Sequence, residues 1–276
     1  MKILVEPISI NHLYELSKKD IGGFIVGIKN YSIFQNLKLS IDELKSINVD
    51  KEIYVSLNKL IYNSELDDIK KILIELSKLN IKGVLFEDIS IYKLNRDLGL
   101  NLNLIWSSMH LPTNSNSCNY WKEKGCVGAL LSTELMVSDF INIKKNTGMV
   151  IMTYLYGYIP IFESSRTLVT NYLKHVNKES NSSIFYAYEK MRDKYYPIYE
   201  EYGNTFITEE VLNGINAVNT LREENIDYIV LNSLMHSEEE FNKVLDEYID
   251  AVNGKVFNKK DVFTGFLFKE SIFKVK

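Results

Sequence analysis

Short apolar runs alternate with longer segments of helical periodicity along this chain of 276 residues, and the alternation occurs eight times. None of the runs alternates cleanly between apolar and polar residues, which is typical of strands in a parallel sheet covered on both faces. The pattern predicts an α/β fold, a (β/α)8 barrel of the TIM type. An open doubly wound sheet is the alternative, but no Gly-x-Gly-x-x-Gly sequence follows any run. The predicted strands are Ile3–Glu6, Gly23–Ile28, Glu52–Asn58, Gly83–Asp88, Leu102–Ser107, Val127–Ser132, Met149–Tyr156 and Ile226–Asn232.

The segments between these runs carry the signals of amphipathic helices. Within Glu65–Asn80, apolar residues recur at the spacing of one helix face. A glycine ends the segment Asn114–Gly125 directly before the next strand, as expected of a helix terminus. Two capping boxes are predicted, Ser40 with Glu43 and Ser237 with Glu240.

One interval, between the seventh and eighth strands, is much longer than the others. Helices are predicted at both of its ends, and the middle is rich in tyrosine, with Ile184–Met191 and Tyr196–Tyr202 able to pair as a hairpin. We expect one barrel domain over residues 1–276, with this tyrosine-rich insertion at about 177–210 and a C-terminal tail at 255–276. The further elements predicted here are helices at Ser164–His175 and Val211–Glu224, a short strand at Asn204–Thr208, and a tail strand within Phe263–Lys276 that lies against the barrel wall.

Charge and cysteine content exclude several classes of protein. A net charge of −4 argues against binding of nucleic acid through the overall field of the molecule, so RNA is expected to bind weakly or through a partner. Cys118 and Cys126 are too few for a disulfide scaffold, and both look structural. The start does not resemble a signal peptide, and no apolar stretch reaches the length of a membrane span. We expect a cytoplasmic protein with no membrane contact.

In a barrel of this type the active site lies where the strands end. Glu87, Asp88 and Glu134 could form paired carboxylates for acid/base chemistry, bind a cation, or pair with an arginine. His110 is placed as a proton donor or ligand, or it bonds a loop carbonyl. Each such side chain could equally cap the following helix. The strand-end candidates are Glu6, Asn58, Glu87, Asp88, Ser107, Ser108, Met109, His110, Ser132, Glu134, Tyr154, Tyr156 and Asn232.

Familiar hydrolase and metal motifs do not occur. The chain has no His-Glu-x-x-His, Cys-x-x-Cys, Gly-x-Ser-x-Gly or phosphate-loop sequence, so no metal site and no cofactor are expected. The remaining histidines, His12, His175 and His236, are expected at the surface. Arg166, beyond the seventh strand, could clamp a carboxylate or phosphate, or pair with Glu163.

Several stretches resemble peptidase family U32, the collagenase-like proteases. The resemblance rests on the segment Tyr154–Lys174, on Val127–Leu135 (VGALLSTEL), on Ile105–Asn114 and on the tail Gly265–Lys276, and it extends over nearly the whole chain. It implies a TIM-type barrel. It also implies either of two kinds of activity. Some members are described as collagenase-like proteases, and others take part in hydroxylation, either of RNA bases or in oxygen-independent ubiquinone synthesis.

The hydroxylation proteins of the family hold a [4Fe–4S] cluster on four cysteines, and this chain departs from that pattern. Pro160 and Thr167 stand at two of the ligand positions, and the later cysteine pair has no counterpart. Because Cys118 and Cys126 lie upstream, the ligand set cannot be carried over. The resemblance therefore implies a member without the cluster, either a U32-type peptidase or a non-proteolytic subunit that acts with a cluster-bearing paralogue in the hydroxylation of tRNA, another RNA or a small molecule.

Four residues match the family pattern and are expected to line a pocket that binds a polar or anionic substrate, a peptide or a small molecule, at the carboxyl end of the barrel. They are Glu134, Arg166, Asn171 and Tyr172. Glu134 is the main acid/base candidate, with His110 and Glu87 as further catalytic candidates. Asp88, Asn58 and Tyr156 complete the predicted substrate-binding set. A carbohydrate-active barrel using Glu87 or Asp88 with Glu134 is a third alternative, and an oligomer is compatible with all three.

Overall fold

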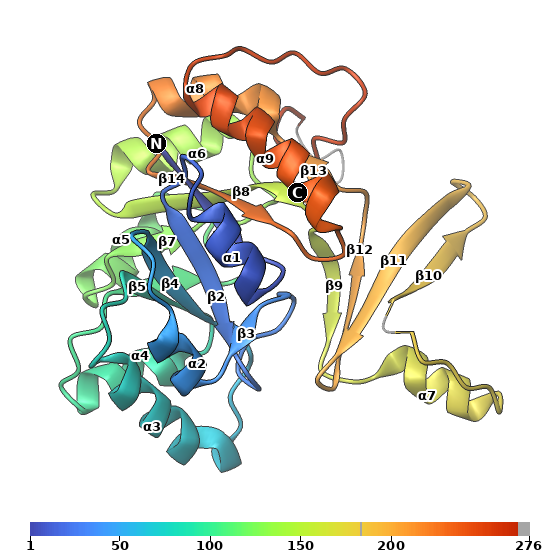
Figure 1. Cartoon of the computed structure of the whole chain (residues 1–276), viewed down its shortest axis with the longest axis horizontal. Helices are drawn as coiled ribbons and strands as arrows, with labels where there is room; N and C mark the ends of the chain where they lie inside the picture. Colours follow the sequence, from blue (N-terminus) through green and yellow to red (C-terminus); the bar gives the residue numbers. More distant parts are fainter. Residues whose placement is uncertain (183, 270–276) are drawn as a thin grey trace. The chain divides into compact units, whose positions relative to one another are not determined.

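Eight parallel strands form a closed barrel in the computed structural model, which describes residues 1–182 and 184–269 (Figure 1). Each strand pairs with the next along the chain, and β1 pairs with both β2 and β14, which closes the ring. The barrel strands are β1 (Lys2–Glu6), β2 (Gly23–Ile28), β4 (Glu52–Leu57), β5 (Gly83–Phe86), β6 (Leu104–Ser107), β7 (Gly128–Leu130), β8 (Val150–Gly157) and β14 (Tyr228–Asn232). The predicted (β/α)8 barrel is confirmed.

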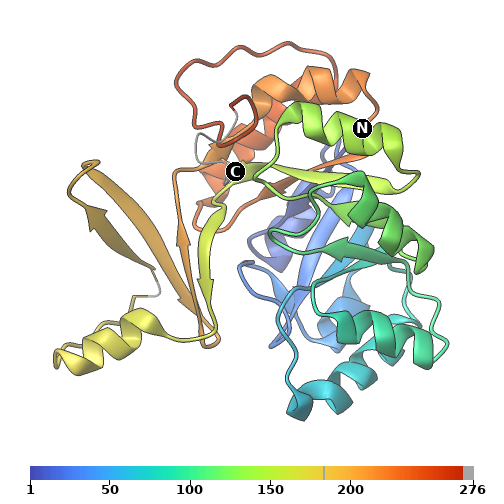
Figure 2. The same cartoon turned by 180° about the vertical axis from the view of Figure 1, so that it is seen from behind.

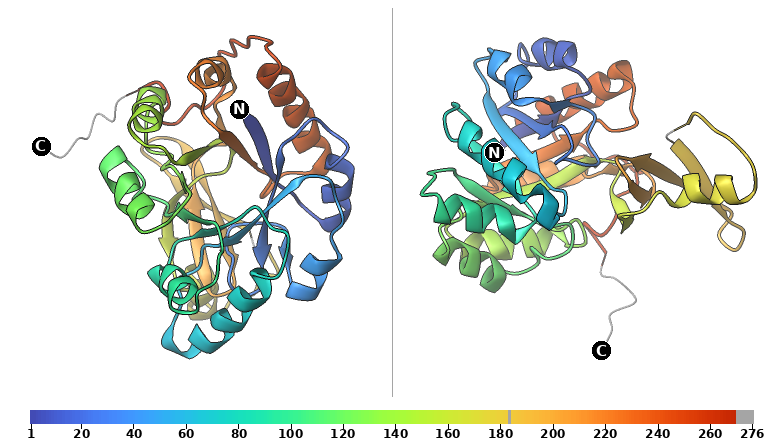
Figure 3. Two further views of the ribbon diagram at one scale, coloured as in Figure 1. Left: turned by 90° about the vertical axis from the view of Figure 1, so that its left-hand side faces the viewer. Right: turned by 90° about the horizontal axis from the view of Figure 1, so that it is seen from below.

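Helices follow the strands and cover the outside of the ring (Figures 2 and 3). The helices of this layer are α1 (Ile10–Leu16), α2 (Ile41–Ser46), α3 (Leu66–Leu76), α4 (Ile89–Asp97), α5 (Ser115–Glu123), α6 (Val137–Asn146), α8 (Val218–Glu223) and α9 (Glu238–Val252). Short elements also occur at β3 (Lys38–Leu39), η1 (Asn63–Glu65), β13 (Leu212–Asn213) and η2 (Ile215–Ala217). Both predicted capping boxes are present, at the starts of α2 and α9.

Some boundaries differ from the predicted ones for local reasons. Asn114, the first residue of the predicted helix segment Asn114–Gly125, is the N-cap of α5, and its side chain accepts the amide hydrogen of Ser117 at 2.9 Å. Strand β5 ends before Asp88 because this residue is the N-cap of α4. The first part of the helix predicted over Val211–Glu224 forms β13 and η2 instead, and only Val218–Glu223 forms α8. Apolar periodicity locates an element, whereas capping contacts fix its ends.

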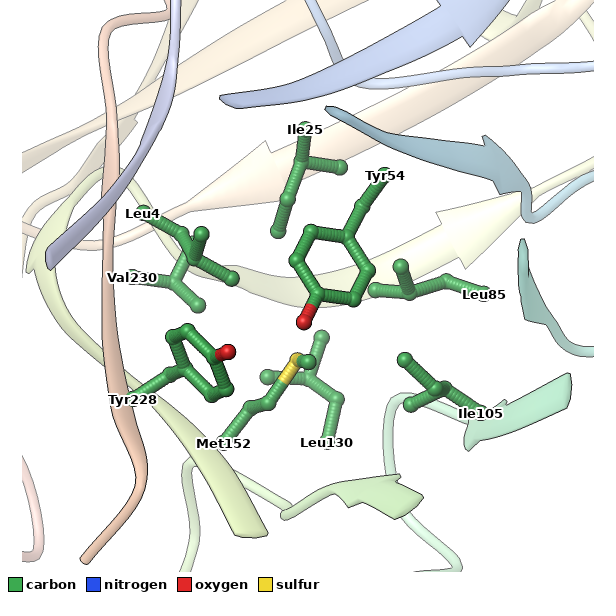
Figure 4. Close-up of a cluster of buried hydrophobic side chains, with 9 residues drawn as sticks. All are labelled: Leu4, Ile25, Tyr54, Leu85, Ile105, Leu130, Met152, Tyr228 and Val230. Carbon is green, nitrogen blue, oxygen red and sulfur yellow. The ribbon is translucent and has the colours of Figure 1, made fainter. Parts of the chain in front are cut away.

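The centre of the barrel is filled by one apolar layer to which every strand contributes. Tyr54 and Tyr228 reach into this layer with their rings at 5.8 Å in an edge-to-face arrangement (Figure 4). On its amino-terminal side, the Tyr228 hydroxyl donates to Glu52 at 2.7 Å. The layer consists of Leu4, Ile25, Tyr54, Leu85, Ile105, Leu130, Met152, Tyr228 and Val230. A filled lumen of this kind makes the barrel a packed core and not a pore.

Residues Tyr158–Leu212 form a second compact unit, here called the insertion unit; the described remainder of the chain is the barrel unit. A four-stranded antiparallel sheet in the order β10-β11-β12-β9 carries one helix, α7 (Leu168–His175). Its strands are β9 (Pro160–Ser164), β10 (Ile184–Glu189), β11 (Lys194–Glu201) and β12 (Asn204–Thr208). The hairpin and the third strand match the predicted ones. That residues 1–276 form one domain with an insertion at about 177–210 stays a prediction.

Strand β9 and the tail differ from expectation. The helix predicted over Ser164–His175 begins only at Leu168, and the first predicted residue, Ser164, instead ends β9 and pairs with Thr205 of β12. In the tail, residues 263–269 form a bridge at Phe263 and then turns, so the predicted strand is wrong for this part. Ile272 and Phe273, which were assigned to the same strand, lie outside the described residues.

A buried carboxylate caps α7 from the neighbouring sheet. The side chain of the formal N-cap, Thr167, makes no capping bond. Instead, Glu200 on β11 accepts the amide hydrogens of Val169 at 2.6 Å and Thr170 at 3.1 Å, and hydroxyl bonds from Thr170 and Thr205. These bonds hold the pKa of Glu200 below its ordinary value although its burial acts in the opposite direction. A negative charge at this end also favours the helix dipole.

We therefore expect Glu200→Ala to loosen the insertion unit selectively. Losing hydrogen bonds to a charged acceptor leaves the first amides of α7 without their partner and costs about 2–3 kcal/mol of local stability. Hydrogen exchange of residues 168–175 should accelerate, while exchange in the barrel strands stays as in the wild type. Glu179→Ala, at an exposed site, is the matched control. Unchanged exchange in α7 of Glu200→Ala would contradict this role.

Candidate functional site at the carboxyl end of the barrel

Polar residues follow the apolar layer at the end of most strands. Because side chains of a strand alternate between faces, the position two residues after each inward residue also points inward. Leu4 is followed in this way by Glu6, and Met152 by Tyr154. The positions defined by this rule are Glu6, Gly27, Ser56, Glu87, Ser107, Ser132, Tyr154 and Asn232. The barrel thus places a set of polar groups together at its carboxyl end.

Glu6 and Tyr154 form a buried pair in this set. The Tyr154 hydroxyl donates to Glu6 Oε1 at 2.6 Å, and Glu6 is 2% exposed. Burial raises the pKa of Glu6 from 4.5 to about 7, while hydrogen bonds from Tyr154 and Gln35 and the charge of Lys38 act in the opposite direction. Burial and the neighbouring carboxylate raise the pKa of Tyr154 well above its ordinary value. A carboxyl group that titrates near neutrality can both accept and donate a proton.

The segment between β2 and β3 covers this pair. Ser32, Gln35 and Lys38 are all buried, and the Lys38 ammonium donates to the backbone carbonyl of Gln35. Gly27 makes room for the segment, because a Cβ there would lie 2.7 Å from Ser32 Cβ and 2.8 Å from Gln35 Oε1. Among the described residues, Glu6 Oε2 and Gln35 Oε1 are buried oxygens with no hydrogen-bond partner. Protonation of Glu6 lowers the cost of burying its second oxygen.

His110 and Glu134 form a second, accessible pair. His110 Nδ1 lies 3.2 Å from Glu134 Oε1, and the two side chains are 53% and 56% exposed. The backbone amide of Glu134 donates to Ser132 Oγ at 3.3 Å, which fixes the turn after β7. The structure therefore brings together two of the three predicted catalytic residues. The third, Glu87, accepts a hydrogen bond from Ser108 Oγ at 3.4 Å.

Two predicted substrate-binding residues of the barrel unit, Asp88 and Asn58, make structural contacts. Asp88 accepts the amide hydrogens of Ser90 at 2.8 Å and Ile61 at 3.0 Å, one on each oxygen. The Asn58 side chain bonds both the amide and the carbonyl of Ile33, at 2.9 and 3.0 Å. These bonds join the loops that follow β2, β4 and β5. Substrate binding by Asp88 and Asn58 stays a prediction.

Tyr156 lies within a cluster of aromatic rings. It is 6% exposed, with ring centroids 5.2 Å from His236 and 6.1 Å from both Phe241 and Tyr248. Burial lowers the pKa of His236. These contacts attach α9 to the end of β8, and substrate binding by Tyr156 likewise stays a prediction.

The other predicted binding residues belong to the insertion unit. Arg166 precedes α7, and its carbonyl accepts a hydrogen bond from Thr205 Oγ1 at 2.6 Å while its side chain is exposed. Asn171 and Tyr172 lie on α7, and Tyr172 is 63% exposed. All three side chains are accessible to a ligand of this unit, and their role as binding residues stays a prediction.

His12 corrects the expectation that it lies at the surface. It is fully buried in α1, where its Nδ1 accepts the amide hydrogen of Ile8 at 3.3 Å and its Nε2 lies 3.1 Å from Asn242 Oδ1. Both ring nitrogens are thus occupied in joining α1 to α9. The two cysteines are also buried, and burial raises the pKa of Cys118 to about 11 and of Cys126 to about 12. Their thiols are therefore protonated at neutral pH.

A hollow of about 750 Å³ lies at the opposite, amino-terminal end of the barrel. Three of its charged residues are already engaged, since Lys2 pairs with Glu52 at 2.9 Å and the Lys51 ammonium donates to the carbonyl of Ile21 at 2.9 Å. Residues at this end of a TIM barrel contribute to stability. Within the part of the chain that the structure describes, no group of three or more His, Cys, Asp or Glu residues could hold a metal ion.

Comparison with known proteins identifies the family. The family model described as Peptidase family U32 matches residues 24–272. The chain belongs to peptidase family U32. The resemblance seen in its motifs is therefore confirmed.

Named relatives within the family are tRNA hydroxylation proteins. The tRNA hydroxylation protein P2 of Bacillus subtilis (strain 168) is 24% identical over 307 aligned positions, which cover 99% of each chain. The tRNA hydroxylation protein P1 of the same organism is 24% identical over 122 positions, 44% of this chain and 29% of that protein. The solved structure of the U32 peptidase Mk0906 superposes with a TM-score of 0.51 at 12% identity, over 84% of this chain and 92% of that one, which supports the fold alone. None of the described helices has the length and apolar character needed to cross a membrane.

The buried carboxyl group generates a prediction about pH. Unfolded chains ionise Glu6 from about pH 4.5 upward, whereas the folded protein keeps it protonated to about pH 7. Stability should therefore fall as the pH rises from 4.5 through 7, by on the order of 3 kcal/mol from this residue. Glu6→Gln has no such ionisation, so its unfolding free energy relative to the wild type should increase over that interval. Denaturant titrations at several pH values measure this, with exposed Glu15→Gln as control. Parallel pH profiles for wild type and Glu6→Gln would contradict the assignment.

Proposed function

We propose that this chain is a subunit of a tRNA hydroxylation system and acts in the cytoplasm together with a second protein of family U32. The observation that carries the proposal is the end-to-end similarity to tRNA hydroxylation protein P2, which covers 99% of both chains. Similarity to protein P1 is confined to less than half of the present chain, so the chain corresponds in extent to the P2 type. Two named types in one organism support a system of paralogous subunits.

The cysteine content supports a division of labour between such subunits. The [4Fe–4S] cluster that the family resemblance implies for hydroxylation proteins needs four thiolates. This chain has two cysteines, both buried as protonated thiols, and Pro160 and Thr167 stand at positions where the cluster-bearing pattern has cysteine. The residues do not fit the cluster. In our proposal the partner subunit holds it, and this chain contributes binding of the tRNA substrate and positioning of the reacting base.

The carboxyl end of the barrel provides groups for that role. Glu134 and His110 are close enough to share a proton and exposed enough to meet a polar or anionic group of a macromolecular substrate. We assign Glu134 as the proton-transfer group and His110 as the residue that orients it. Glu87, bonded to Ser108, is the supporting carboxylate of the same barrel end.

Peptidase activity is the other activity suggested by the family. Peptide hydrolysis requires an activated nucleophile or a metal-bound water. Both ring nitrogens of His12 are occupied by structural contacts. Cys118 and Cys126 are buried with raised thiol pKa values, so neither is an activated nucleophile. The likeness to the U32 peptidase Mk0906 extends to the fold. We therefore favour the hydroxylation role over proteolysis.

A complementation experiment tests the proposed function. A bacterial strain that lacks both types of tRNA hydroxylation protein is given this chain, a P1-type protein, or both. We expect only the pair to restore a tRNA nucleoside heavier by one oxygen atom, measured by mass spectrometry of digested tRNA. The purified chain should leave gelatin and peptide libraries intact with and without a chelator. If the purified chain cleaved peptides and tRNA in the strain carrying both proteins stayed unmodified, the proposal would be refuted and the chain would be assigned as a peptidase.

The assignment of Glu134 gives a second test in the same strain. Glu134→Gln keeps the size and removes the charge, so the hydroxylated nucleoside should fall about tenfold or more. Because the side chain is half exposed, the melting temperature should stay within about 1–2 °C of the wild type. Exposed Glu123→Gln is the control. Full hydroxylation with Glu134→Gln would exclude Glu134 from the chemistry.

A further inference from the structure

The segment from Arg166 to Lys178 in the insertion unit is uniformly cationic. It contains four basic residues, Arg166, Lys174, His175 and Lys178, and neither aspartate nor glutamate. All four are exposed on α7 or next to its ends, together with Asn171 and Tyr172. We call these six residues the cationic strip. Positions 171, 174 and 175 follow helical spacing and belong to one side of α7. Lys178 lies just beyond the helix, after Asn177, whose φ of 53° ends the helical path.

Among the described residues, no carboxylate forms an ion pair with the arginine or the lysines of the strip. Within residues 1–182 and 184–269, the side chains of Arg166, Lys174 and Lys178 form no ion pair. Two other cations of the same unit are paired, Arg192 with Glu189 at 3.3 Å and Lys194 with Glu209 at 2.9 Å. Uncompensated cations on an otherwise acidic chain attract an anionic ligand to one place instead of spreading attraction over the surface.

Glu200, the carboxylate that contacts this helix, lies away from the lysines of the strip. It is 9% exposed, and its oxygens accept hydrogen bonds from Val169, Thr170 and Thr205 at the amino-terminal end of α7, whereas Lys174 and Lys178 lie at or beyond the other end. It fixes the helix through the sheet and leaves the cations to solvent. The hydrogen bonds of Glu200 anchor the start of α7 to the sheet, and a preorganised helix loses less entropy when a ligand binds.

The chemistry of the strip fits RNA. Lysine and arginine bind phosphate groups, and asparagine adds a neutral hydrogen-bonding group. Tyr172 is 63% exposed among these side chains and offers a ring on which an unpaired base can stack. We propose that the cationic strip binds the phosphate backbone of tRNA, with Tyr172 stacking on a base of a single-stranded loop. This rests on the proposed function and names the surface through which that substrate is held.

The test compares two triple variants of the full chain. Arg166→Gln/Lys174→Gln/Lys178→Gln removes three charges from the strip. Lys18→Gln/Lys70→Gln/Lys260→Gln removes three exposed, unpaired lysine charges from the described part of the barrel unit and leaves the same net charge. Binding of unmodified bulk tRNA is measured at several salt concentrations. We expect the affinity of the strip variant for tRNA to fall at least about tenfold. The slope of log K against log salt concentration should become less steep by about two, and both quantities should stay near the wild-type values in the control.

Equal binding by the two variants would overturn the proposal, as would strip-variant binding identical to the wild type. Lysine and histidine near the end of a helix also stabilise its dipole, so folding needs its own controls. Arg166→Lys/Lys174→Arg/Lys178→Arg retains the charges and should restore binding. Tyr172→Leu should lose about tenfold while Tyr172→Phe retains binding, because stacking needs the ring and not the hydroxyl. Equal binding by Tyr172→Leu and wild type would remove the stacking contact.

The cellular assay separates this inference from the proposed function. Restored hydroxylation by the wild type together with unaltered hydroxylation and tRNA binding by the strip variant would refute the strip and leave the function intact. Loss of tRNA binding by the strip variant in a protein that never restores hydroxylation would support the RNA surface and refute the function. Retained tRNA binding with loss of co-purification of the P1-type protein would refute the RNA proposal and assign the strip to a protein partner.

Discussion

Closure of the sheet is the constraint on which the barrel depends. Strand β1 pairs with β14 over its whole length and with β2 through Leu4 and Val5, so the first and last strands must meet. The strands approach closely at Gly23, where a Cβ would lie 2.1 Å from the carbonyl oxygen of Glu52. Since all eight strands run in one direction, closure places their carboxyl ends together at one end of the barrel, and with them the polar residues that follow each strand.

Closure also determines the electrostatics inside the lumen. The apolar layer separates the Glu52–Tyr228 contact at the amino-terminal end from the Glu6–Tyr154 contact at the other. Glu52 keeps a lowered pKa because Lys2 and Tyr228 bond it, whereas at Glu6 the effects of Tyr154, Gln35 and the charge of Lys38 are outweighed by burial. The same residue type is thus ionised at one end and titrates near neutrality at the other. Groups with such separated pKa values are typical of functional sites.

The elements that rest on local patterns were predictable from sequence, and those that rest on distant partners were not. Hairpin β10–β11 and both capping boxes involve neighbours in the chain and were found. Strand β9 was missed because its partner β12 lies some 40 residues away. The burial of Glu6 depends on Gln35 and Lys38 from another loop, and the burial of His12 on Asn242 from α9. Glu6 was visible as a polar strand end, but no sequence signal distinguished it from the capping residue Asp88.

The polar contacts of the two units suggest how a cluster-free member of the family retains a role. Asp88 and Asn58 are used to join loops, so the groups at the barrel end that remain adaptable are Glu6 with Tyr154 and Glu134 with His110. In the insertion unit, Glu200 is committed to capping α7, and the arginine and lysines of the strip form no ion pair among the described residues. A carboxylate placed among those cations would have stabilised them and weakened their attraction for phosphate. Proton transfer and anion binding require preorganised side chains and not a metal cluster. A chain that lacks the cysteine ligands of the cluster can therefore still bind and position a substrate through its unpaired side chains.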